Sequence, residues 1–270
     1  MKKMMGNLLS LIFIGCNLQA DIIETNSVKD LVSHVEEGTL VVFDIDNTLL
    51  ECNQMFGSHE WFCYQMQALK ERGLDSHQAL AKVLPLYTDI QPHTSFRLVE
   101  AEVVEIIRSL QRAGYPVMAL TSRDELVSEA TKRHLYAHGI DMRLTAPLKE
   151  SAVLEHEGET THYQEGVLFT GNAQGGAHKG KALWALLEKT PNLPRKIVFI
   201  NDTFSHLLPV EEVAAQKKIA FIGLRYGVTD IKVQQFRQEI ADIQKEFYKK
   251  ILTDEAAEAI LRDRQAKGKM

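Results

Sequence analysis

The chain has 270 residues, of which 45% are hydrophobic, and its formal net charge at pH 7 is −5. These values are typical of a globular protein with one large domain, or with a core and a smaller inserted module. Nucleic acid is a poor partner for an acidic chain, because phosphates would be repelled and no dense run of Lys or Arg offsets that repulsion.

The first twenty residues differ from the rest of the chain. Two lysines precede an apolar run from Leu8 to Ile14, and Ala20 stands before Asp21. This pattern predicts a signal peptide, residues 1–20, and a periplasmic or secreted protein. Its removal leaves 29 Lys and Arg against 36 Asp and Glu, a net charge of −7. The run is far shorter than the roughly 20 residues of a membrane-spanning helix, so no span is expected; lipidation of Cys16 is the alternative to cleavage.

A strand buried on both faces is predicted at Leu40 to Phe43, because its apolar run is continuous rather than alternating. Asp44 and Asp46 follow it, at the edge where open α/β sheets bind ligands. Two adjacent carboxylates repel each other. They therefore indicate a bound cation such as Mg²⁺, or a nucleophile beside a general acid and base whose pKa its environment raises. A surface turn is the plain alternative.

The segment after this strand, up to about Phe96, is mostly helical in pattern. An aromatic-rich helix is followed by a second helix that Asp75 or Ser76 can cap, and packing in the core is the plain interpretation of both. Cys52 and Cys63 are the cysteines that remain after the leader. An oxidising compartment permits a disulfide between them, but two buried thiols fit equally well.

Leu98 to Ala113 is predicted to form an amphipathic helix, and Pro116 to Thr121 a second buried strand that ends in a hydroxyl. Ser122 and Glu125 have the spacing of a capping box, which predicts a helix from Glu125 to His138. The Thr121 hydroxyl and the amides of that helix N-terminus could hold a phosphate oxygen.

Arg123 follows Thr121 and Ser122, and it is predicted either to grip a phosphate or carboxylate as a fork or to lie on the surface. Further along the chain, the segment Thr161 to Thr170 is predicted to form a β-hairpin with a glycine near its turn.

A glycine-rich stretch ends in Lys179, Gly180 and Lys181 and leads into a helix. An ammonium group there would offset the repulsion of the paired carboxylates and bind a phosphoryl oxygen. Lys179 is preferred for this role, because Lys181 is expected half a turn further round the helix.

The third apolar strand, from Lys196, closes in Asn201 and Asp202. A further strand is predicted at Lys218 to Leu224. Apolar residues from Val233 to Phe247 recur at helical spacing, which predicts one long closing helix.

The segment Phe43-Asp44-Ile45-Asp46-Asn47-Thr48-Leu49 resembles the first motif of the haloacid dehalogenase (HAD) superfamily of phosphohydrolases. Thr121, Lys179 and Asp202 resemble its second, third and fourth motifs, in the right order. The resemblance implies a Rossmann-like α/β core formed by residues 21–50 and 97–252. It also implies a helical cap insertion at residues 51–96, with a C-terminal helical tail at residues 253–270.

The resemblance further implies the roles in the site. Asp44 would attack phosphorus, and Asp46 would protonate the leaving group and then activate water. Thr121 and Lys179 would hold the phosphoryl oxygens, with Ser122 and Arg123 beside them as phosphate-binding candidates. Mg²⁺ would bridge Asp44, the backbone carbonyl of Asp46, and Asp202.

Asn201 departs from the family pattern, which has Asp or Gly at this position in many members. The site therefore has one negative charge less, although an amide oxygen can still bind a metal or orient its water. The expected function is Mg²⁺-dependent hydrolysis of a small phosphate monoester, with no expectation for the oligomeric state.

The alternatives are a dehalogenase, a phosphoacceptor signalling domain, a phosphotransferase of the same fold, and a secreted interaction protein whose HAD site is degenerate. Asp46 argues against the dehalogenase, since a halide leaving group needs no proton. A signal peptide fits a signalling domain poorly, and Asn201 is the feature that favours a degenerate site.

Overall fold

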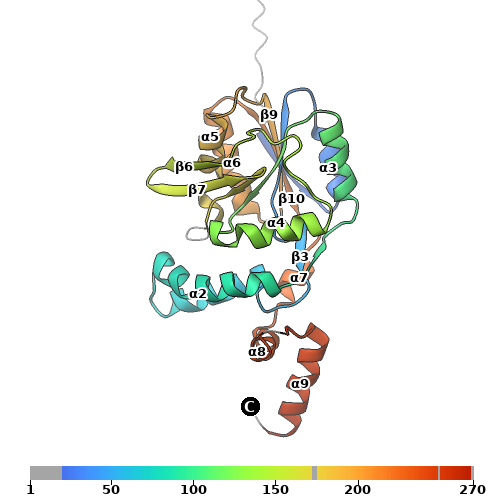
Figure 1. Ribbon diagram of the computed structural model, residues 1–270, viewed down its shortest axis with the longest axis vertical. Helices are drawn as coiled ribbons and strands as arrows, with labels where there is room; N and C mark the ends of the chain where they lie inside the picture. The colour runs from blue at the N-terminus through green and yellow to red at the C-terminus, as the bar shows by residue number, and fades with distance from the viewer. Residues whose placement is uncertain (1–19, 172–174, 249, 269–270) are drawn as a thin grey trace, which may run out of the picture.

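The computed structural model describes residues 20–171, 175–248 and 250–268. Residues 1–19 of the predicted leader, Cys16 among them, lie outside this part, and its last residue, Ala20, is described. The described residues form a central eight-stranded sheet (Figure 1). Its strands, from one edge to the other, are β1 (Ala20–Thr25), β10 (Ala220–Tyr226), β9 (Lys196–Asn201), β2 (Thr39–Phe43), β5 (Val117–Thr121), β8 (Val167–Phe169), β7 (Glu159–Gln164) and β6 (Ala152–His156).

The first six strands of this order pair in parallel. β7 and β6 extend the sheet as antiparallel strands. The predicted hairpin is confirmed as β7 and β8, which turn at Glu165 and Gly166, whereas β6 was not predicted. The α/β class with a mostly parallel sheet is confirmed.

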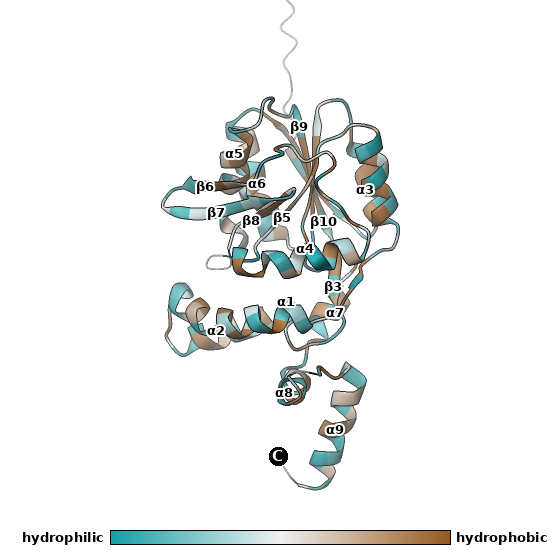
Figure 2. Cartoon of the chain, viewed as in Figure 1, coloured by the Kyte–Doolittle hydropathy of each residue, from teal (hydrophilic) through white to brown (hydrophobic). Residues whose placement is uncertain are grey.

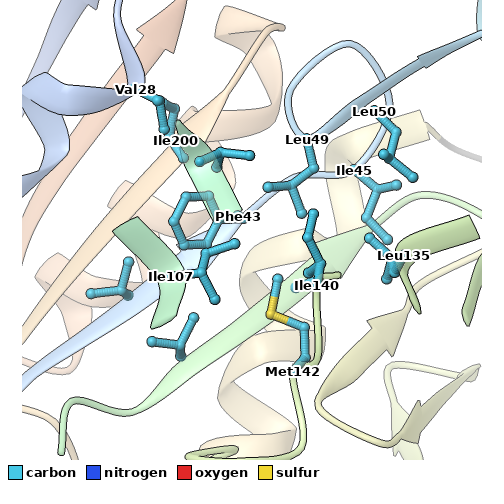
Figure 3. Close-up of a cluster of buried hydrophobic side chains, with 14 of the residues drawn as sticks. Val28, Phe43, Ile45, Leu49, Leu50, Ile107, Leu135, Ile140, Met142 and Ile200 are labelled. Atoms are coloured by element: carbon cyan, nitrogen blue, oxygen red, sulfur yellow. The ribbon is translucent and has the colours of Figure 1, made fainter. Parts of the chain in front are cut away.

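The central strands β2, β5 and β9 are buried on both faces, which explains their continuous apolar runs. Along β2, Val41 and Phe43 point to one face and Leu40 and Val42 to the other. On the first face, the strands pack against α3 (Val103–Arg112), the 3-10 helix η1 (Val28–His34) and residues after α4 (Ser128–Ala137), as Figure 3 shows for part of the cluster. α5 (Lys179–Leu187) and α6 (Phe204–Gln216) cover the second face. In Figure 2 the central strands, such as β5 and β8, are mostly brown and β7 is mostly teal, while the helices carry both colours, as amphipathic helices should.

The connection after β5 differs from its prediction. A 3-10 helix, η3 (Glu125–Val127), precedes α4, and Asp124 rather than Ser122 caps it by accepting a hydrogen bond from the Leu126 N–H. The capping box of Ser122 with Glu125 is therefore wrong. Residues 122–124 are left as a short loop at the carboxyl end of the strand.

The segment between β2 and β5 contains two helices, α1 (His59–Glu71) and α2 (Ser76–Ile90), followed by the 3-10 helix η2 (Gln91–His93). The predicted cap of α2 is confirmed, because Asp75 and Gln78 form a reciprocal capping box. Figure 1 shows this pair below α4, at one end of the sheet. A short antiparallel ribbon of β3 (Leu50–Cys52) and β4 (Phe96–Leu98) joins the helices to the core. Leu98 therefore belongs to β4, and α3 starts later than predicted.

The predicted long closing helix is wrong. α7 (Asp230–Gln234) ends before Phe236, and α8 (Gln238–Glu246) begins after Arg237, whose backbone is extended. The break allows the Phe236 ring to pack near Tyr64 of α1, with ring centroids 5.8 Å apart. α8 then packs against the last helix, α9 (Asp254–Ala266).

Both described cysteines are free thiols: Cys52 is buried and Cys63 is exposed. The structure thus contains neither the disulfide nor the pair of buried thiols that the sequence left open. Within the described ranges, no helix has the length and apolar character needed to cross a membrane.

Candidate active site

The candidate residues meet at the carboxyl ends of three neighbouring strands. β2 lies between β9 and β5 in the sheet, so Asp44 comes between Asp202 and Thr121 although the three are far apart in sequence. The chain leaves β2 toward one side and returns to its other side with β9, which makes this edge a topological switch point. All three residues line one narrow pocket, together with Asp46, Ser122 and Arg123.

Lys179 forms an ion pair with Asp44 inside this region. Its Nζ lies 2.6 Å from Asp44 Oδ1, and the Lys179 side chain is fully buried. Burial raises the pKa of Asp44, and the charge and hydrogen bond of Lys179 counteract part of that rise. Gly180, the next residue, allows α5 to pack closely on α6, because a Cβ there would lie 1.9 Å from the Pro209 carbonyl oxygen. Lys181, with half its side chain exposed, pairs instead with Glu157 outside the pocket.

Arg123 forms the second ion pair of the site. Its Nε and Nη2 donate to the two carboxylate oxygens of Asp46 at 2.9 and 2.7 Å. The side chain is 2% exposed, lies over the Phe96 ring and also donates to Thr131. Arg123 is therefore a carboxylate fork, and its predicted surface alternative is wrong.

This pairing reverses one expectation about the acids. Burial alone would raise the pKa of Asp46, but the charge and hydrogen bonds of Arg123 outweigh burial and lower it to about 2. The sequence-based expectation of a raised pKa at Asp46 is therefore wrong for this state of the site. With both oxygens in the guanidinium fork, the Asp46 carboxylate is ionised.

The loop that holds Asp46 is shaped by the residues that follow it. Asn47 takes a left-handed backbone conformation, with φ of 58°, and its side chain donates to Glu60 of α1 at 2.9 Å. Thr48 Oγ1 accepts a hydrogen bond from the Asp202 N–H at 3.1 Å. These contacts connect the loop after β2 to α1 and to the end of β9.

Two hydroxyl groups lie on the β5 side of the pocket. Thr121 Oγ1 accepts a hydrogen bond from the Arg123 N–H at 3.1 Å, which leaves its own proton to donate. The Ser122 hydroxyl is buried and has no hydrogen-bond partner among the described residues. An oxyanion in the pocket would provide acceptors for both.

Asp202 lacks an ion-pair partner within the described chain. Burial, and then the charge of Asp44, raise its pKa to about 7. The neighbouring Asn201 points its amide oxygen at the Thr203 N–H, 2.8 Å away, while its buried NH₂ group has no partner in the described part of the chain. Asp202, whose carboxyl group has no ion-pair partner among the described residues, is thus better suited than Asn201 to bind a cation.

The donor set fits Mg²⁺. Two carboxylates, Asp44 and Asp202, line the pocket with Asp46, and the Asp46 carbonyl accepts no hydrogen bond from described residues. In the described ranges, no three His, Cys, Asp or Glu side chains are arranged to hold a metal ion. Mg²⁺ needs fewer protein ligands, because it keeps several waters and commonly binds one or two carboxylates plus a substrate phosphate.

The sequence did not identify the pocket-lining residues that come from α1, α2 and α6. His59 and Phe62 of α1 and Tyr87 of α2 line it, together with His206 of α6. His59 and Phe62 are three residues apart and therefore lie on one face of α1. This spacing was the signal in the sequence that could have identified them as neighbours in a site.

The pKa values of the two histidines that line the pocket are shifted in opposite directions. Cys63, whose Sγ lies 3.4 Å from His59 Nε2, raises the pKa of His59 well above its usual value, aided by Asp46 and Asp202 and opposed by burial. Burial, and then the charge of Lys179, lower the pKa of His206 to about 2. His206 is therefore neutral.

Comparison with known proteins places the chain in a family. A protein of Chlamydia pneumoniae named "Putative outer membrane protein" is 25% identical over 242 residues, or 88% of this chain and 89% of that protein. A Chlamydia muridarum protein of the same name is 27% identical over 224 residues, 83% of this chain and 82% of its own. A Rickettsia prowazekii protein is 24% identical over 236 residues, 83% and 82% of the two chains. The family model described as "Protein of unknown function (DUF2608)" matches residues 24–258, so the chain belongs to that family.

Proposed function

We propose that this protein is a Mg²⁺-dependent phosphate monoester hydrolase of the HAD type, with a Rossmann-like core and a helical cap. The observation that carries the proposal is the buried pair of Asp44 with Lys179, beside Asp202 at the ends of adjacent parallel strands. Phosphoryl transfer requires mainly a positioned nucleophile and groups that stabilise negative charge, and we assign these roles to Asp44 and to Lys179, Thr121 and Ser122.

Asp44 is the nucleophile in this mechanism. It lies at the centre of the three strand ends, and Lys179 holds one of its oxygens at 2.6 Å. That contact orients the carboxylate and favours its ionised form against the effect of burial. Attack on phosphorus forms an aspartyl phosphate, which water hydrolyses in a second step.

The phosphoryl oxygens would be bound from the β5 side and from α5. The Thr121 and Ser122 hydroxyls donate hydrogen bonds, and Lys179 contributes a positive charge that is almost free of water. When bound by Asp44, Asp202 and the Asp46 carbonyl, Mg²⁺ would neutralise the charge that develops on the transferring group.

Asp46 is the general acid and base, although it is ionised before substrate binds. A phosphoryl dianion beside Asp46 would raise its pKa through like-charge repulsion, and it would compete with Asp46 for Arg123. The fork of Arg123 keeps Asp46 in position. Once a bound anion has raised its pKa, Asp46 would take up a proton from solvent and give it to the leaving oxygen as the ester P–O bond breaks, and the regenerated carboxylate would then take a proton from the attacking water.

We place the protein in the cell envelope. The relatives from Chlamydia carry the printed name "Putative outer membrane protein", and the leader predicted from the sequence directs a chain out of the cytoplasm. A periplasmic or secreted phosphatase agrees with both.

The test is a panel of phosphate monoesters incubated with the mature protein, in Mg²⁺ or in chelator. We expect turnover in Mg²⁺, loss of turnover in chelator, and background activity for Asp44→Asn. Asp46→Asn should lose on the order of 10²- to 10⁴-fold, as expected for a general acid and base. It should also retain phosphate on Asp44, which intact-mass spectrometry would detect.

Absence of turnover across the panel, with Mg²⁺ shown to bind, would contradict hydrolysis and favour a secreted interaction protein. Full activity of Asp44→Asn would remove this residue from the nucleophile role.

A further inference from the structure

The pocket has a chemically distinct wall on the cap side. Three cap residues line it, namely His59, Phe62 and Tyr87, and the other lining residues come from the core. Phe62 is 5% exposed and Tyr87 2% exposed, and their ring centroids lie 4.8 Å apart at an interplanar angle of 58°. The cap therefore presents two aromatic rings and one imidazole to whatever binds below it.

The in-line geometry of phosphoryl transfer determines which part of a substrate contacts the cap side of the pocket. The leaving oxygen stands opposite the attacking oxygen across phosphorus. Asp44 attacks from the sheet edge, so the leaving group points away from the strands. The residues on that side are the two cap rings and His59.

We infer that the leaving group is an aromatic alcohol, so that the substrate class is phosphate monoesters of aromatic alcohols, bound with the ring against Phe62 and Tyr87. This inference rests on the proposed function. Aromatic rings gain binding free energy from tilted or edge contacts in addition to the area that they bury. A pocket wall of two rings offers both contributions.

Charge and hydrogen bonding disfavour the other common leaving groups. The lysine and arginine residues of the cap, Lys70, Arg72 and Lys82, do not line the pocket, so a second phosphate would face Asp46 and Asp202 with His59 as its single cationic partner from the cap. Sugar leaving groups carry several hydroxyls, whereas the cap wall offers only His59 and the Tyr87 hydroxyl as polar partners. Burying unpaired hydroxyls is costly.

The test compares binding of two phosphonates that cannot be hydrolysed, benzylphosphonate and 2-hydroxyethylphosphonate, with inorganic phosphate as reference. Calorimetry in Mg²⁺ gives each affinity without depending on leaving-group reactivity. We expect benzylphosphonate to bind at least 10-fold more tightly than 2-hydroxyethylphosphonate. Phe62→Leu should reduce this ratio at least 3-fold while phosphate affinity changes less than 2-fold.

Tyr64→Leu is the matched control, because Tyr64 is an exposed aromatic residue on the same helix and outside the pocket. It should keep the wild-type ratio. Thermal unfolding of each variant identifies loss of the fold, and Tyr87→Phe supplies a second ring variant that keeps the apolar volume and the ratio.

The outcomes separate the two proposals. Equal affinities for the two phosphonates, with phosphate bound and monoesters hydrolysed, would overturn the aromatic class and leave the phosphatase intact. Tighter binding of 2-hydroxyethylphosphonate would overturn it in favour of polyol phosphates. Absence of phosphate binding and of turnover would overturn the proposed function, and the inference with it.

Discussion

Two acids of the site, Asp46 and Asp202, have opposite electrostatic environments. Arg123 stabilises the Asp46 carboxylate, whereas burial and Asp44 destabilise the charge of Asp202. Neutralising Asp46 should leave the buried guanidinium of Arg123 without its partner, which costs on the order of 3 to 5 kcal/mol. Neutralising Asp202 removes a repulsion.

We therefore predict that Asp46→Asn lowers the free energy of unfolding in chelator at pH 8, and that Asp202→Asn raises it. Urea unfolding measures both. Equal destabilisation by the two substitutions would contradict this assignment of charges.

The two lysines at the start of α5 differ in burial and in ion-pair partner. Lys179 is buried on Asp44, while Lys181 is exposed on Glu157. We predict that Lys179→Met, which keeps the side-chain volume, lowers turnover on the order of 10²- to 10³-fold, the usual effect of removing one charge-stabilising donor. Lys181→Met is the control and should stay within 2-fold. Steady-state kinetics would decide, and similar losses in both variants would place the phosphate elsewhere.

The two described thiols offer a test of the cap that is independent of activity. Cys52 is 4% exposed, and burial raises its pKa to about 12. Cys63 is exposed beside His59. We predict that a disulfide reagent modifies one thiol of the folded mature protein quickly and the second only in denaturant. Peptide mapping should find the fast site at Cys63, and rapid labelling of Cys52 would contradict the packing of β3.

At the scale of elements, the C-terminal helices α8 and α9 hold the turn that precedes α1. Gln244 of α8 is fully buried, and its Oε1 accepts a hydrogen bond from the Phe56 N–H at 2.8 Å. Its Nε2 donates to the Leu252 carbonyl at 2.9 Å and to Asp254 Oδ1 at 2.8 Å, and Asp254 accepts from the Met55 N–H. The turn before α1, and with it the position of His59, thus depends on α8 and α9.

We predict that Gln244→Leu destabilises the protein by about 1 to 3 kcal/mol, since it leaves a buried N–H of residue 56 unpaired. Gln216→Leu, an exposed position on α6, is the matched control and should be near neutral. Chemical unfolding measures the difference. A loss as small as the control's would show that the C-terminal helices do not brace the cap.

The whole molecule should respond to pH through Asp202. Its pKa is about 7 in the folded protein against an ordinary value of 3.8. Between these values the folded state binds a proton that the unfolded state has released. The free energy of unfolding therefore falls as pH rises from about 4 to 7, through this group by about 1 to 4 kcal/mol.

The wild type in chelator should thus lose more stability than Asp202→Asn between pH 5 and pH 8. Mg²⁺ should restore stability above pH 7, because it binds the ionised carboxylate, by about 2.7 kcal/mol at one hundred times its dissociation constant. Thermal unfolding with and without Mg²⁺ would show this. Identical pH dependence of the two proteins would contradict the raised pKa.

The sequence by itself determined the features that depend on local pattern. Continuous apolar runs ending in Asp44, Thr121 and Asp202 predicted three buried strands with polar residues at their carboxyl ends, because a strand covered on both faces must be apolar throughout. The Asp75 cap of α2 was readable for the same reason, since donor and acceptor lie within one turn.

Only the tertiary structure decided which of these segments meet. The order of β9, β2 and β5 places the three strand ends together, and the fork of Arg123 on Asp46 joins residues 77 positions apart. The same holds for the aromatic cap wall and for the break before α8, where packing of Phe236 overrides a helical pattern. Such contacts, and the pKa shifts that follow from them, depend on the pairing of distant segments, and local propensity contains no term for that pairing.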